Sequence, residues 1–559
     1  MKRTSILFFA LAVLNLSLSA QKSISIDFNT TLDTIQSILG GNRFWENTVE
    51  LLHKEGIEEI RIHDYHDAGD YCFYSNFWNT DNNGDFTEIN PDFSPENPLD
   101  YNWTATDDAI DEIISNDFNV FFRIGVSYPN PSIPPMAPYV PPSNSSSEPL
   151  NFSNFASLSK HTLMHYNHLW DNGYSYGIKY WEVWNEPGGA FWYGSPIQYY
   201  KMFQAVSDSM KNYDDTILVG GPGAVPTTTI GAQPDFRENF IQYCSNNNVD
   251  LDFYSWHIYG IENPYGVKVF ADTIRALLDM NGYENTQSIV SEINFELATG
   301  LDSIKDSSYG AAHYLSTVLT MLEAGVDKLL WYPSACHVMH FNGDTISSRS
   351  YYAMLALELM QTNTPIRVQG DGNEVIEGYW NVDTTNLMVF AGKSVDEDKL
   401  YILISNLDSE HSSFNIDITN LPWSTSDDIR IIKNEITDSE RFTQTETLVN
   451  GHSTISIIAE NYSSPSILFY RIEKAIINEV TDIYADKPLF QNPVQENLVF
   501  TELPKACEYF EIYNMAGRLV KSGAIKNTLN VSNFVSGFYL MVLKDENSKK
   551  LKALKFQKK

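Results

Sequence analysis

The sequence predicts an α/β fold: a (β/α)8 TIM barrel, followed by an antiparallel β-sandwich and a small C-terminal β-sandwich domain. Three observations carry this prediction. Between about residues 35 and 355, short apolar runs alternate with segments of helical periodicity. After about residue 356, the runs alternate apolar and polar side chains between turn-forming residues. Near residue 474 the composition changes again, from acidic to basic.

The barrel is predicted from its repeated units. Three segments, 48–55, 105–116 and 199–212, repeat apolar residues every three or four positions, as amphipathic helices do. Parallel strands need such crossover helices, and eight strand–helix units fit a closed barrel, assigned here to residues 21–355. Its working residues should lie at the C-terminal ends of the strands, near a Pro-rich loop at 129–142. The eight apolar runs are 36–41, 57–63, 120–126, 178–185, 217–221, 251–257, 288–292 and 328–332.

The second domain, assigned to residues 356–474, has the period-2 pattern of half-buried antiparallel strands. An N-terminal run at 24–28 has the same pattern and is expected to pair with this sandwich. The predicted sandwich strands are 387–391, 399–407, 414–421, 428–432, 454–458 and 466–472.

The third module is the basic tail, assigned to residues 481–559. It holds 12 Lys and Arg residues against 8 Asp and Glu, and five of its lysines fall in the last ten positions. Because the whole chain carries a net charge of −34, this reversal marks a separate unit.

The strongly acidic balance argues against nucleic acid or an anionic membrane as a partner, and weakly against a polyanionic substrate. Residues 1–20 have the basic start, short apolar run and small-residue end of a secretory signal. No segment has the length of a membrane span. The widely spaced Cys72, Cys244, Cys336 and Cys507 disfavour a zinc site; buried thiols are favoured over a disulfide, although the first three leave one open.

Two glutamates stand at the ends of predicted strands. The fourth run ends in Asn185, Glu186 and Pro187, and the seventh ends in Glu292. Polar groups inside a barrel are costly unless they have a task, although a lone Asn-Glu-Pro is equally well a strand-ending turn. Cleavage of a glycosidic bond needs two carboxyl groups, one acid and one anion. A gap of about 5–5.5 Å predicts retention of configuration, and a wider gap predicts inversion.

Other predicted strand ends carry polar or aromatic groups that suit such a site. A guanidinium can keep a neighbouring carboxylate ionised, and an imidazole or phenol can hydrogen-bond a nucleophile or a sugar. Each alone is more often structural, but their shared position at strand ends favours a site. These residues are Arg61, His63, His257, Tyr259 and Trp331.

The set Arg61, His63, Asn185, Glu186, His257, Tyr259, Glu292 and Trp331 resembles that of clan A glycoside hydrolases. The wording Tyr-Trp-Glu-Val-Trp-Asn-Glu-Pro at 180–187, and a barrel joined to a sandwich, most resemble glycoside hydrolase family 39 over residues 36–472. The resemblance implies that Glu186 is the acid/base, Glu292 the nucleophile and Asn185 a ligand of the sugar 2-hydroxyl. The aromatic residue common after the nucleophile is Ile293 here, which leaves the sugar preference open.

This resemblance implies a secreted retaining glycoside hydrolase acting on plant or algal polysaccharides or their oligosaccharides, with an exo-acting, xylosidase-like β-glycosidase as the first candidate. No cofactor and no metal is implied, and the segment 81–85 is interpreted as a turn rather than a calcium loop. The alternatives are an arabinosidase, a uronidase, an endo-glycanase or a non-catalytic surface glycan-binding protein. A uronidase needs a cation for the substrate carboxylate, and Arg43 and Arg123 are the candidates nearby.

The tail resembles a type IX secretion C-terminal sorting domain in three segments, 489–494, 512–518 and 536–540, and in its Lys-rich end. The resemblance implies secretion machinery as a partner. It also implies export through the periplasm and outer membrane to the cell surface or the medium. An ordinary accessory sandwich is the alternative.

Overall fold

The computed structural model describes most of the barrel, the sandwich and the tail. The secretory signal at 1–20, the loop at 129–142, the turn at 81–85, Cys72 and His63 lie outside the described residues. The residues described are 21–62, 78–80, 86–89, 94–101, 103–125, 149, 151–188, 191–192, 194–225, 235–261, 263–295, 302–341, 344–374, 387–475, 494–500, 503, 507–514, 518–545 and 550–559.

Eight parallel strands close a barrel, as the alternating pattern predicted. Their order around the barrel is β10-β11-β2-β3-β6-β7-β8-β9, so neighbours in sequence are neighbours in space. Each predicted run overlaps one of these strands, which are β2 Leu39–Asn42, β3 Glu59–Arg61, β6 Asn119–Ile124, β7 Tyr180–Val183, β8 Leu218–Ala224, β9 Phe253–Tyr259, β10 Gln287–Asn294 and β11 Lys328–Trp331.

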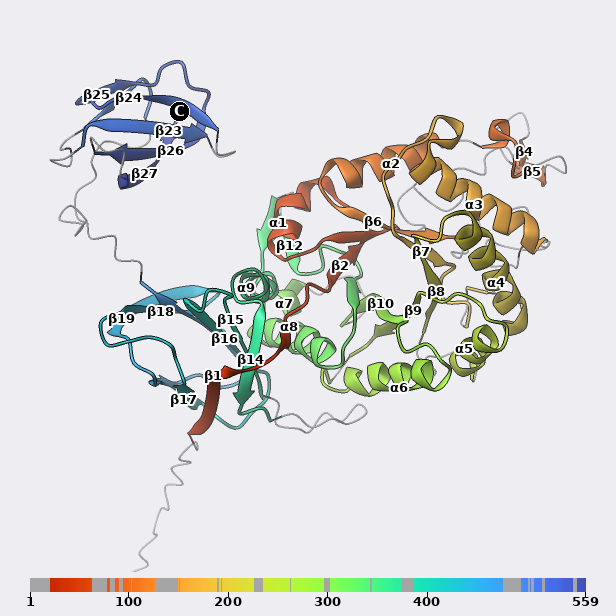
Figure 1. The fold of residues 1–559 in the computed structure, drawn as a ribbon, viewed down its shortest axis with the longest axis horizontal. Helices are drawn as coiled ribbons and strands as arrows, with labels where there is room; N and C mark the ends of the chain where they lie inside the picture. Colours follow the sequence, from red (N-terminus) through yellow and green to blue (C-terminus); the bar gives the residue numbers. More distant parts are fainter. Residues whose placement is uncertain are drawn as a thin grey trace, which may run out of the picture. The chain divides into compact units, whose positions relative to one another are not determined.

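Helices surround the barrel strands on the outside (Figure 1). Polar caps start several of them: the Asn151 side chain accepts hydrogen bonds from the Ser153 and Asn154 amides, and Ser195 and Gln198 form a capping box. These helices are α1 Val49–Lys54, α2 Thr104–Ser115, α3 Phe152–His168, α4 Pro196–Tyr213, α5 Phe236–Asn246, α6 Val267–Met280, α7 Asp302–Lys305, α8 Ser308–Glu323 and α9 Arg349–Asn363.

Apolar and aromatic side chains fill the half of the barrel interior nearer the N-terminal ends of the strands. They are Phe121, Tyr180, Phe253, Ile289 and Leu330. Side chains two residues further along a strand face the same side. The next inward positions toward the C-terminal ends of β6 and β7 are Arg123 and Glu182, both fully buried. The polar site therefore lies directly above a layer of packed apolar side chains.

The second domain is a nine-stranded sheet that folds over its own core. Its order is β19-β18-β21-β16-β15-β14-β1-β17-β20, and residues from both ends of that order share one buried cluster. The strands are β1 Lys22–Thr34, β14 Ile366–Asp371, β15 Leu387–Lys393, β16 Lys399–Asn406, β17 Ser413–Thr419, β18 Asp428–Ile436, β19 Thr443–Asn450, β20 Ile455–Glu460 and β21 Ser466–Lys474.

The N-terminal strand β1 belongs to this sheet, as predicted for residues 24–28. It pairs antiparallel with β14 and parallel with β17, so the sheet contains a parallel pair that the antiparallel prediction lacked. At β15 the outer face of the sheet packs on the barrel. Leu387 and Val389 lie in the sandwich core, whereas Met388 and Phe390 lie in the barrel core. Alternation along β15 thus joins the two domains.

The C-terminal unit, 475–559, has its own core and is described by itself. Its strands form a four-stranded sheet, β24-β23-β26-β27, and a separate pair, β22 and β25. Its strands are β22 Asn497–Val499, β23 Tyr509–Asn514, β24 Leu519–Ala524, β25 Thr528–Asn530, β26 Gly537–Lys544 and β27 Lys550–Lys558. Elsewhere, short two-stranded pairs are formed by β4 Trp78–Thr80 with β5 Phe86–Ile89 and by β12 Val338–Phe341 with β13 Asp344–Ser347.

Within the described ranges, no helix has the length and apolar character needed to cross a membrane. Cys244 and Cys336 are buried free thiols, and Cys507 is a partly exposed one.

We predict that β1 is needed for the stability of the sandwich. Phe28 is fully buried against the edge of Trp423, whereas Leu32 on the same strand is 54% exposed. Phe28→Ala should lower the free energy of unfolding by about 3–5 kcal/mol because it leaves a cavity. Leu32→Ala is the matched control and should change it by less than about 0.5 kcal/mol. Equal effects in urea unfolding would contradict this packing role.

Candidate active site

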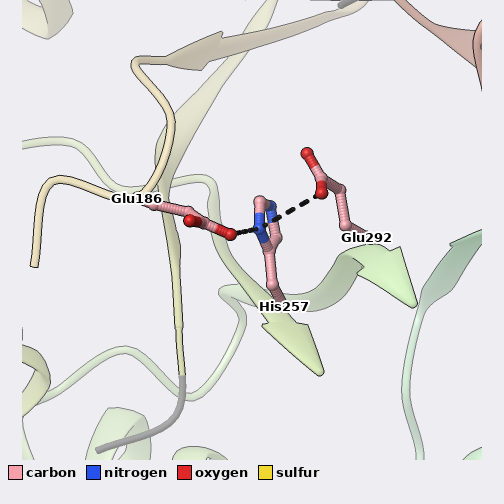
Figure 2. A group of neighbouring side chains, drawn as sticks. All are labelled: Glu186, His257 and Glu292. Carbon is pink, nitrogen blue, oxygen red and sulfur yellow. Dashed lines mark hydrogen bonds and ion pairs between the residues drawn. The ribbon is translucent and has the colours of Figure 1, made fainter. Parts of the chain in front are cut away.

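The C-terminal ends of four barrel strands bring together six of the residues singled out in the sequence. Arg61 ends β3, Asn185 and Glu186 follow β7, His257 and Tyr259 lie at the end of β9, and Glu292 lies near the end of β10. Figure 2 shows the carboxyl groups of Glu186 and Glu292 on either side of the His257 ring.

Glu292 reaches the barrel interior because of a β-bulge in β10. Val290 pairs with Trp256 and Glu292 with His257, so Ser291 is an extra residue relative to β9; β10 is shifted against β11 in the same stretch. Simple alternation from Ile289 would turn Ser291 inward and Glu292 outward. A bulge re-aims the residue that follows it. Both side chains therefore contact His257, through Ser291 Oγ at 3.1 Å and Glu292 Oε2 at 3.6 Å.

Glu186 is placed by a break in strand geometry after β7. Trp184 and Glu186 both have left-handed backbones, with φ of +74° and +48°. Such angles are costly for residues with a side chain and persist only where neighbours fix them. Here the Trp184 amide donates to the Ile124 carbonyl, and the Glu186 amide donates to the Gly223 carbonyl. The break directs the Glu186 carboxyl toward His257.

The two carboxyl groups are close. Glu186 Oε1 lies 2.7 Å from His257 Nδ1. One carboxyl oxygen of Glu186, one carboxyl oxygen of Glu292 and one ring nitrogen of His257 lie within 4.8 Å of one another. The two carboxyl groups therefore face each other across the mouth.

Glu292 accepts a hydrogen bond on each oxygen. Arg61 Nη1 donates to Oε1 at 2.7 Å, and the Tyr259 hydroxyl donates to Oε2 at 2.6 Å. Burial, followed by the charge of Glu292, raises the pKa of Tyr259 well above its usual range, so the phenol keeps its proton. Both contacts favour the anionic form of Glu292.

Arg61 is fully buried and is the central cation of the site. Its Nε donates to Glu182 Oε2 at 2.6 Å, and its Nη2 donates to Asn185 Oδ1 at 2.9 Å. Burial alone would lower the pKa of Arg61, but the charges of Glu182 and Glu292 raise it above its ordinary value. The guanidinium therefore stays charged.

Three residues in this network were not singled out in the sequence. Asn42, at the end of β2, accepts from Arg61 Nη1 at 2.9 Å and donates to the Ser291 carbonyl at 2.8 Å. Glu182 and Ser291 are the others. Glu182 carried a usable signal, because a charged residue in the middle of a buried parallel strand needs a partner.

Unlike those of the other predicted site residues that the structure describes, the Trp331 side chain is not part of the hydrogen-bond network around the two carboxyl groups. Its ring is 1% exposed and packs edge-on against Tyr314 and His337. Within the described ranges, its indole N–H has no hydrogen-bond partner, so it does not bond to either carboxyl group. Of the uronidase candidates, Arg123 is fully buried and Arg43 lies over the Tyr332 ring, 4.9 Å from its centroid.

The cluster of Glu186, His257 and Glu292 has the donor types of a metal site. Two features make it a poor one. Both Glu292 oxygens already accept hydrogen bonds, and the Arg61 cation lies 2.7 Å from one of them. A divalent cation would be repelled by that guanidinium and would have to displace these donors.

Two family models match parts of this chain. The family described as Glycosyl hydrolases family 39 matches residues 41–299, and that described as Secretion system C-terminal sorting domain matches residues 489–556. These matches confirm both resemblances seen in the sequence. The second confirms the predicted export to the cell surface or the medium.

Two curated relatives are β-xylosidases, each matched over a limited stretch. The enzyme of Geobacillus stearothermophilus is 25% identical over 159 residues, covering 25% of this chain and 30% of the relative. That of Caldicellulosiruptor saccharolyticus is 34% identical over 82 residues, covering 14% and 15%. The chain thus spans less than a third of either relative's length.

Solved structures share the fold at low sequence identity. A glucosidase from Croceicoccus marinus has a TM-score of 0.61 and 17% identity, covering 82% of this chain and 100% of its own. The family 39 enzyme from Xanthomonas axonopodis pv. citri has a TM-score of 0.59 and 14% identity, covering 83% and 100%. They support the barrel-and-sandwich architecture.

We predict that Gly125 is required for the backbone break at the mouth. Its φ is +107°, and an added Cβ would lie 2.4 Å from the Trp184 ring. Gly177 also has a positive φ, +71°, but an added Cβ there would meet no atom within 4 Å. Gly177→Ala should therefore cost only the backbone strain, about 1–2 kcal/mol, and Gly125→Ala clearly more. Equal losses in free energy of unfolding would contradict the close-approach argument.

Proposed function

We propose that the barrel is the catalytic domain of an exported retaining β-glycosidase of the xylosidase type. One observation carries the proposal: the carboxyl oxygens of Glu186 and Glu292 approach within 4.8 Å. Retaining enzymes hold their two carboxyl groups about 5–5.5 Å apart, whereas inverting enzymes leave about 6.5–9.5 Å for a water molecule. In this proposal the barrel domain spans residues 21–355, except for β1, which belongs to the sandwich sheet. The sandwich spans 356–474 and the sorting domain 481–559.

Glu292 is the nucleophile in this proposal. Its carboxylate attacks the anomeric carbon, forms a glycosyl ester and breaks the bond to the leaving oxygen. The hydrogen bonds from Arg61 and Tyr259 hold it ionised and aimed, with one oxygen fixed by each donor. In the second step, water attacks the same carbon and Glu292 leaves again as the carboxylate.

Glu186 is the acid and base. It gives its proton to the leaving oxygen in the first step and takes one from the attacking water in the second. His257 lies within hydrogen-bond distance of Glu186 Oε1, and its other nitrogen lies near Ser291 Oγ. The imidazole therefore orients the Glu186 carboxyl through both proton transfers.

Asn185 is the proposed ligand of the sugar 2-hydroxyl, as the resemblance implies. Its Oδ1 already accepts from Arg61. That bond leaves the amide nitrogen as the group available to donate to the sugar. Hydrogen bonds to the 2-hydroxyl strengthen at the transition state of this reaction.

The sugar is proposed from the curated relatives, which are β-xylosidases. The test is hydrolysis of a panel of aryl glycosides: β-xyloside, β-glucoside, α-arabinofuranoside and β-glucuronide. Proton NMR then follows the anomer formed first. We expect fastest turnover of the β-xyloside with the β-anomer released first. No turnover of any glycoside, or release of the α-anomer from the β-xyloside, would overturn the proposal.

We predict separate effects for the two glutamates. Glu292→Gln should lower the rate more than about 10⁴-fold on every substrate, because no nucleophile remains. Glu186→Gln should lose about 10²–10⁴-fold on substrates that need a protonated leaving group. Glycosylation by dinitrophenyl glycosides should lose far less, because their leaving group needs no proton. Glu284→Gln, at an exposed position, is the control. Near-full activity of either active-site variant would refute its assignment.

We also predict that export depends on the C-terminal unit and catalysis does not. Residues 475–559 form a compact unit with its own core. A chain ending at Lys474 should keep full activity in vitro and accumulate in the periplasm of its native host. Fractionation of that host, with the full-length chain as control, measures this. Normal release of the truncated chain would rule out a sorting role.

A further inference from the structure

A third carboxylate is buried beneath the two that face each other across the mouth. Glu182 lies on β7, is fully buried, and accepts from Arg61 Nε at 2.6 Å through its Oε2. Its Oε1 is also buried, and no donor in the described part of the chain reaches it. Burying a carboxylate costs several kcal/mol even when it is paired. This free-energy cost falls directly below the site, which indicates that Glu182 has a task there.

Glu182 holds the end of the guanidinium nearest to the Arg61 backbone. The three guanidinium nitrogens are all engaged: Nε by Glu182, Nη1 by Asn42 and Glu292, and Nη2 by Asn185. The guanidinium is planar, so fixing Nε fixes the directions of both Nη groups. The bond from Arg61 to Glu292 therefore depends on the bond from Arg61 to Glu182.

The same contact divides the charge of Arg61. Glu182 and Glu292 both form ion pairs with this one guanidinium, at 2.6 and 2.7 Å. The more completely a cation stabilises a carboxylate, the weaker that carboxylate is as a base and nucleophile. Glu182 takes up part of the positive charge and leaves less of it for Glu292.

Other ionisable groups lie near this pair on β6, on β9, after β7 and on α4. Arg123 on β6 stands beside Glu182 in the strand register. Around Glu292, β9 contributes His257 and Tyr259, and the residues after β7 contribute Glu186. Burial, followed by the charges of Cys244 and Glu182, raises the pKa of Tyr199 on α4 well above its usual range. Arg61 forms ion pairs with both Glu182 and Glu292.

We propose that Glu182 is a positioning residue that sets the reactivity of Glu292 through Arg61. It aims the guanidinium at Glu292 and, by its charge, limits how strongly the guanidinium stabilises that carboxylate. This inference rests on the proposed function, in which Glu292 is the nucleophile.

Glu182→Gln removes the negative charge of the side chain but keeps its size and its hydrogen bond to Arg61. The amide oxygen can replace Oε2 as the acceptor for Arg61, and the amide nitrogen can replace Oε1, where the described structure has no donor. Gly223 lies beside this group and has no side chain to obstruct it: a Cβ built there would lie 3.5 Å from Glu182 Oε1. Glu182→Asp keeps the charge and shortens the reach.

The test measures how fast the nucleophile is trapped by a 2-deoxy-2-fluoro glycoside with a dinitrophenyl leaving group, as a function of pH. The sugar is the one that the wild-type protein cleaves. This leaving group needs no proton. The fall in trapping rate at low pH, the acidic limb of the pH profile, therefore reports the ionisation of Glu292 and not that of Glu186.

For Glu182→Gln we expect the acidic limb to move down by about one pH unit, because Glu292 then faces more of the Arg61 charge. The plateau trapping rate should fall about tenfold, because the anion is a weaker nucleophile. Glu182→Asp should keep the limb in place and lower the plateau rate.

Glu59→Gln is the matched control. Glu59 is a buried carboxylate on the same strand as Arg61, paired with Lys328 at 2.8 Å. This control should leave both limb and plateau unchanged while lowering the melting temperature. An unmoved limb in Glu182→Gln, or a limb that also moves in Glu59→Gln, would overturn the inference. If Glu182→Gln does not fold, a limb displaced in Glu182→Asp overturns it instead. Failure of the wild-type protein to be trapped at all would refute the proposed function, and the inference with it.

Discussion

The buried guanidinium of Arg61 is the interaction on which the rest of the site depends. Two acidic side chains this close to each other, inside a barrel closed below by apolar residues, would repel each other or take up a proton. Arg61 contacts one of them, Glu292, and is itself held by Glu182, Asn42 and Asn185. The cation lets one carboxyl stay ionised while the other keeps a separate partner, His257.

The backbone supplies the second constraint. Glu292 would point away from the mouth if β10 were a regular strand. Glu292 arrives there through the extra residue in β10, and Glu186 through two left-handed residues after β7. Gly125 leaves room for the Trp184 ring that this second break displaces. Two left-handed residues, Trp184 and Glu186, lie where the chemistry is proposed, and the regular barrel around them holds them in place.

Much of this arrangement could be predicted from the sequence because it follows from periodicity. The eight strands repeat a simple pattern and the polar strand ends interrupt it. The export tail was predicted from its basic composition and its resemblance to a sorting domain. Asn42 was missed because it closes a short Gly-rich run in which Asn is an ordinary turn residue. The bulge at Ser291 was missed because an inserted residue changes the facing of Glu292 without altering local composition. Strand β19 was missed because it is an exposed edge strand with polar residues on both faces.

The proposed chemistry needs both constraints at once, since the nucleophile must be charged, aimed and close to the acid. The most direct measurement is the mass-spectrometric location of the sugar after trapping with a 2-deoxy-2-fluoro glycoside. The account predicts one added glycosyl group per chain, attached to the peptide that contains Glu292. A label on Glu186, or hydrolysis of the matching glycoside with no covalent adduct at any site, would contradict it.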